Sequence, residues 1–117
     1  MATREEFLRL MWERINSPLR EYWIDNVVRA SKKDPEAPFA DVGPVLERLL
    51  ASGASRRDLS LLIRYAAYEE AFSLLYLLCD PGVDEGDLEG LYESLLTADP
   101  SGKEGRPGSA PEKDDKA

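Results

Sequence analysis

The sequence predicts an all-α protein: a compact five-helix bundle with a central apolar helix at about 56–79 and a disordered C-terminal tail. Apolar residues recur at helical spacing in five segments, and no stretch shows the two-residue alternation of a strand. Proline and glycine separate these segments. We therefore expect a single helical domain over residues 1–97, of ordinary size for one core. Residues 98–117 are rich in Pro, Gly and Ser and almost without bulky apolar residues, which predicts disorder.

The central helix is the stretch around which the others are expected to pack. Residues 59–79 are apolar around nearly the whole circumference of a helix, so this helix has no good solvent face. Such a helix should be enclosed by other helices. Arg64, Glu69 and Glu70 interrupt the stretch, so we do not expect it to span a membrane.

The first two helices are predicted from capping residues. Thr3 and Glu6 form a capping-box pair, so the first helix should begin directly after Thr3. Ser17 and Pro18 then suit the start of a second helix over residues 18–31, because proline has a fixed φ that fits a first helical turn.

Two more helices flank the central one in the sequence. A proline-containing loop at 32–40 precedes a third helix at 41–51, with its leucines and valines on one face. A fifth helix at 84–97 has an apolar stripe of leucines and a tyrosine. Gly86 and Gly90 each lower its propensity by about 1 kcal/mol relative to alanine, so this helix should depend on docking.

Composition excludes several functions. A net charge of −8 argues against a general nucleic-acid binder, which needs a basic surface. The chain has no histidine and one cysteine, so it can build neither a histidine-based catalytic triad nor a disulfide within the chain. The lone Cys79 suits a reducing setting. We expect a cytoplasmic protein that is not an enzyme and has no catalytic residues, metal or cofactor.

The charge distribution gives the first interpretation of function. Residues 80–98 contain six acidic side chains and no basic one. The helix dipole favours acids in a first turn, which explains about half of them structurally. An acidic face can also steer a basic partner into place. We therefore expect an interaction module, such as an inhibitor, an immunity-type protein or an adaptor, that binds a basic protein through Asp84, Glu85, Asp87, Glu89 and Glu93.

Polar residues within the central helix support two alternatives. A carboxylate beside tyrosines can anchor a ligand, which would make the protein a small-molecule binding or sensor domain. Ordinary surface pairing with arginines is the simpler explanation of the same residues. The second alternative is a homodimer, because the apolar surface of this helix exceeds what four short helices should cover. The candidate pocket residues are Arg64, Tyr65, Tyr68, Glu69 and Tyr76.

Overall fold

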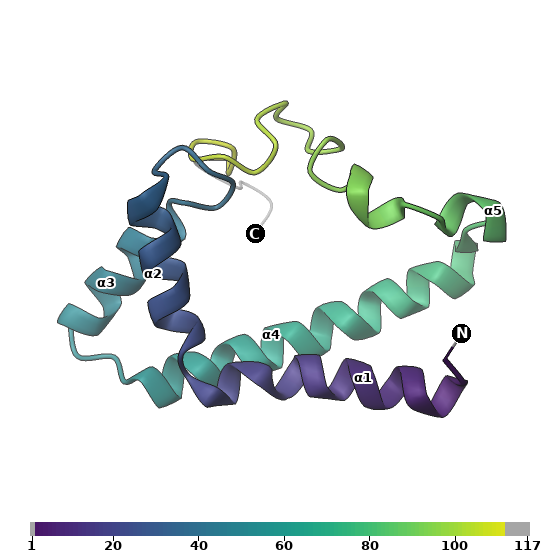
Figure 1. The fold of residues 1–117 in the computed structure, drawn as a ribbon, viewed down its shortest axis with the longest axis horizontal. Coiled ribbons are helices and arrows are strands. Elements are labelled where there is room, and N and C mark those ends of the chain that lie inside the picture. Colours follow the sequence, from purple (N-terminus) through teal and green to yellow (C-terminus); the bar gives the residue numbers. More distant parts are fainter. Residues whose placement is uncertain (1, 112–117) are drawn as a thin grey trace.

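A computed structural model describes residues 2–111 and confirms the all-α prediction for this part of the chain, which contains five α-helices and no strand (Figure 1). Three short helical turns complete the element order. The α-helices are α1 (Arg4–Asn16), α2 (Trp23–Lys33), α3 (Val42–Ala51), α4 (Arg56–Leu77) and α5 (Glu85–Leu88), and the turns are η1 (Ser17–Arg20), η2 (Leu78–Gly82) and η3 (Leu91–Ser94).

Side-chain caps begin two of the helices, the predicted cap Thr3 at α1 and Ser55 at α4. The Glu6 amide donates to Thr3 Oγ1 at 3.1 Å at the start of α1. The Asp58 amide donates to Ser55 Oγ at 2.9 Å at the start of α4. Each bond satisfies an amide that has no partner within its own helix. Helix starts that depend on such local bonds are therefore where the sequence places them.

The predicted second helix is divided in two. The element η1 begins at Ser17, one residue before the predicted start at Pro18, so Ser17 lies inside it and does not cap it. Glu21 then adopts a left-handed conformation with φ of 70°. A helix cannot continue through this backbone conformation. The chain therefore turns before α2 begins, and α2 leaves the line of α1 (Figure 1).

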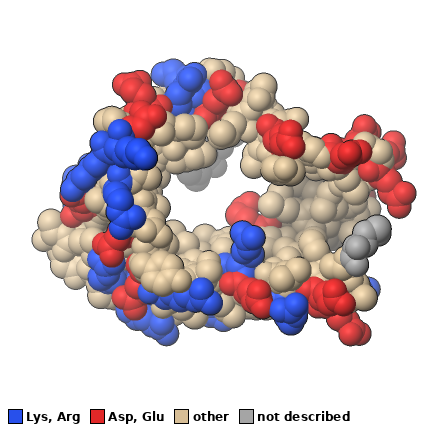
Figure 2. Space-filling view, viewed as in Figure 1, with Lys and Arg blue, Asp and Glu red and all other residues tan. Residues whose placement is uncertain are grey.

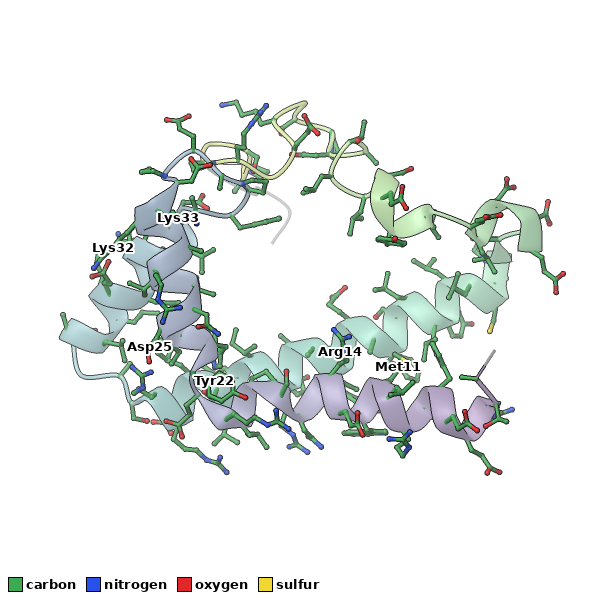
Figure 3. All side chains as sticks on the ribbon, in the orientation of Figure 1. Met11, Arg14, Tyr22, Asp25, Lys32 and Lys33 are labelled. Carbon is green, nitrogen blue, oxygen red and sulfur yellow. The ribbon has the colours of Figure 1, made fainter. Side chains whose placement is uncertain are left out.

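The buried core lies where α2 and α3 meet the first turns of α4. Ile24, Leu46 and Leu59 form it, one from each helix. The Trp23 indole donates to the fully buried Ser60 hydroxyl at 2.8 Å, which ties α2 to α4. An ion pair of 2.7 Å between Arg56 and Asp25 joins the same two helices at the surface. Figure 3 labels Asp25 on α2.

The long helix α4 also has α1 packed along it in the opposite direction (Figure 1). The rings of Trp12 and Tyr68 lie 5.8 Å apart between centroids, inclined by 31°. Arg64 Nε donates to Asn16 Oδ1 at 2.7 Å near the other end of the contact between α1 and α4. Helix α1 therefore covers one side of α4.

The covering of α4 differs from the expectation that other helices enclose it. Only Leu59 and Ser60 of this helix are buried. The described residues form a ring around an opening (Figure 2), and their radius of gyration is 16.5 Å, against about 13 Å for a compact domain of 100 residues. Because the other helices pack on α4 at one side and one end only, much of its apolar surface remains exposed.

The predicted fifth helix over 84–97 is wrong in length. It ends at Leu88 as the four-residue α5, and Gly90 follows with φ of 72°. The chain then forms the short turn η3. Neither α5 nor η3 has a buried residue, so no packing offsets the low helix propensity of Gly86 and Gly90.

The start of the predicted tail closes the ring. Residues 98–111 form successive turns rather than the disordered chain expected for 98–117. Asp99 accepts hydrogen bonds from the Ser101 amide and hydroxyl and from the Gly105 amide. The Phe39 amide donates to the Gly105 carbonyl at 2.7 Å. The rest of the predicted tail, 112–117, lies outside the described residues.

Candidate interaction surface

The predicted acidic residues lie together at one corner of the molecule. Figure 2 shows acidic side chains gathered over α5 and the turn before it. All are exposed, and none takes part in an ion pair within residues 2–111. We name residues 80–93 the acidic segment; its carboxylates are those of Asp80, Asp84, Glu85, Asp87, Glu89 and Glu93.

The acidic segment is not the single helical face that the sequence predicted. Glu85 and Asp87 lie on α5, Asp84 directly precedes it, and Glu93 lies in η3. The chain is extended at Glu89, between the two. The carboxylates are therefore spread over two short turns and the extended residue that joins them.

Exposed apolar side chains alternate with these carboxylates. Tyr92 is 80% exposed and Leu95 is 74% exposed, and Leu88 and Leu91 are also exposed. Sequence reasoning placed them on a buried stripe, because leucine spacing is the same for a core stripe and for an interface stripe. The corner thus presents apolar contact area as well as negative charge.

The predicted ligand pocket is only partly assembled. Arg64, Tyr65 and Tyr68 line a groove of about 410 Å³ between α1 and α4, together with Trp12, Ile15 and Leu61. Glu69 and Tyr76 do not line it, and both are exposed. The groove is open to solvent and its lining is mainly apolar, so it resembles a contact surface more than an enclosed ligand site. Ligand binding there stays a prediction.

Two further features bear on the kind of site. Within residues 2–111, no three Cys, Asp or Glu side chains lie close enough together to hold a metal ion. No helix in the same range combines the length and apolarity needed to cross a bilayer.

Comparisons with protein-family models, characterised proteins and solved structures found no match. The geometry of the surface therefore carries the functional argument.

Proposed function

We propose that this protein is a protein–protein interaction module whose acidic segment binds a basic surface on a partner. The observation that supports this is the composition of one exposed corner. Six carboxylates stand there with no basic residue between positions 80 and 98, and large apolar side chains are exposed among them.

Each kind of residue has a separate role in such a contact. Unpaired carboxylates attract a basic partner over about one Debye length, roughly 8 Å at physiological salt, and set its orientation. Tyr92 and the exposed leucines supply the apolar area that holds the complex once it forms. An inhibitor, an immunity-type protein or an adaptor would use a surface of this kind. The exposed thiol of Cys79 suits a reducing cytoplasmic setting for it.

The test compares three tagged proteins in capture from a host lysate at low salt. The first is the wild type, and the second is Asp84→Asn with Asp87→Asn and Glu89→Gln. The third is a control with the same change in net charge, made at the exposed Glu5, Glu36 and Glu104, each replaced by Gln. We expect one basic protein to be captured by the wild type and the control and lost with the second. Equal capture by all three would contradict the proposal.

A further inference from the structure

The exposed surface of α4 contains a regular seam. The four most exposed large apolar side chains of this helix are Leu62 (65%), Tyr65 (64%), Phe72 (60%) and Tyr76 (59%). Glu69 lies on the same face, between Tyr65 and Phe72. The five residues, at positions 62, 65, 69, 72 and 76, are therefore separated by three, four, three and four positions. This is the a/d spacing of a coiled-coil seam. The residues fall within an arc of about 80° on a helix with 3.6 residues per turn. We name these five residues the α4 seam.

The α4 seam is large enough to form the centre of a dimer interface. An aromatic side chain can bury about 150–250 Å². The three aromatic residues and the leucine of the seam are each exposed by about three fifths. Together they therefore offer roughly 450 Å² of apolar area for burial against a partner. A standard interface buries about 800 Å² on each partner. Ala66 and Ser73 flank the seam and are small, which allows a second helix to approach closely. The seam therefore supplies more than half of the required area.

We propose that a second copy of this chain covers the α4 seam, with the two α4 helices antiparallel about a twofold axis. The same seam then serves on both copies, as a twofold contact requires. Neither the area nor the spacing depends on the acidic segment binding a basic partner. The dimer therefore stands or falls independently of that proposed function.

Charge favours the antiparallel arrangement over the parallel one. A parallel pair would bring the two acidic segments together, which is repulsive. Arg57, in the first turn of α4, is exposed and takes part in no ion pair among residues 2–111. It lies some 30 Å of helix from the acidic segment of its own chain. In an antiparallel pair it lies at the same end of the interface as the acidic segment of the second copy.

The seam also fixes a register. In antiparallel coiled coils, a positions face d positions of the other helix. One register pairs four of the five seam residues with one another: Tyr65 faces Tyr76 of the second copy, and Glu69 faces Phe72. Tyr65 is four residues before Glu69 on the same helix, so these two side chains are neighbours on the seam. This register places Leu62 opposite the exposed Cys79 of the second copy.

The mass of the full chain in solution is the first test. We expect the wild type to sediment at twice its 13.1 kDa under reducing conditions, and Phe72→Glu to sediment as a monomer. Leu74→Glu is the matched control, since Leu74 is 56% exposed on α4 but lies outside the seam. It should leave the dimer intact. A monomeric wild type at about 100 μM, or a dimer that Phe72→Glu does not weaken, would overturn the proposal.

Disulfide formation tests the direction and register. Leu62→Cys should form a covalent dimer with the native Cys79 at least tenfold faster than Leu74→Cys at equal concentration. A bond within one chain is excluded, because 17 residues of helix separate the two thiols by about 25 Å. The wild type should crosslink slowly, since its two Cys79 residues lie at opposite ends of the interface. A wild type that crosslinks as fast as Leu62→Cys indicates a parallel pair, and no advantage of Leu62→Cys over Leu74→Cys excludes this register.

Discussion

The hydrogen bond between Trp23 and Ser60 joins two elements through one fully buried hydroxyl. Ser60→Ala removes the acceptor of the Trp23 indole, which then has no partner in the structure. An unsatisfied buried donor costs about 1–3 kcal/mol, and partial exposure of Trp23 places the effect near the lower value. Chemical denaturation measures it. Ser73→Ala, exposed on the same helix, should change the free energy of unfolding by less than about 0.5 kcal/mol. Equal effects of the two changes would contradict this assignment.

The stability of residues 98–111, which close the ring, depends on pH because of Asp99. The hydrogen bond from the Gly105 amide, followed by those from Ser101, lowers the pKa of Asp99 below its ordinary value of 3.8. A carboxyl with a lowered folded-state pKa stabilises the fold above its unfolded value, and this is lost as the pH falls through the folded value. We therefore expect the Gly105 amide resonance in NMR to titrate with a midpoint below 3.8. A midpoint at or above 3.8 would show that the loop is not held in this way.

At the same scale, sequence reasoning succeeds where the determining contact is local. Thr3 and Ser55 cap their helices through amides three residues away, so both starts could be read from the sequence. Glu21 shows the opposite case. Glutamate rarely adopts a positive φ, so nothing in its identity signals the turn that divides the second helix. The acidic residues were found from composition, whereas their exposed apolar neighbours were assigned to a core.

Among the elements, α2 and α3 form the most extensive contact. Gly43 is buried in α3, and a Cβ atom added there would lie 2.5 Å from Ser31 Cβ in α2. Rotation of the serine cannot relieve this overlap, because Cβ is fixed by the backbone. Gly43→Ala should therefore destabilise the fold by about 1–2 kcal/mol, although alanine gains up to 1 kcal/mol in helix propensity.

Gly86→Ala is the matched control for that change in denaturation experiments. No atom lies within 4 Å of an added Cβ at Gly86, which sits in α5 without a positive φ. The Gly86→Ala change should therefore leave the stability of the protein unchanged or raise it slightly. If Gly43→Ala were also neutral, the packing of α2 on α3 would be looser than the structure shows.

Two of the errors in predicting whole elements have one physical origin. The helix expected at 84–97 needed docking to offset its two glycines, and no docking surface covers it. The helix at 56–77 was placed correctly, but its apolar circumference was assigned to a core. Periodicity shows that a helix has an apolar face that favours burial. It does not show whether the same chain or another copy covers that face.

At the scale of the whole molecule, charge and apolar surface are distributed unevenly. The acidic segment lies at α5, and Lys32 and Lys33 end α2 across the molecule from it (Figure 3). The core is small, with Ile24, Leu46 and Leu59 at its centre, while α4 keeps much of its apolar surface exposed. A chain with this balance gains stability by association, because a partner that binds only the folded state favours it.

The role of the acidic segment is tested by measuring how tightly the protein binds the basic partner recovered by capture, as a function of salt. The affinities of the wild type, the variant at Asp84, Asp87 and Glu89, and the charge-matched control are compared between low and physiological salt. We predict that salt weakens binding of the wild type and the control together, and that the variant binds more weakly and responds less to salt. If the three proteins bound with one affinity at every salt concentration, the acidic segment would not be the binding surface.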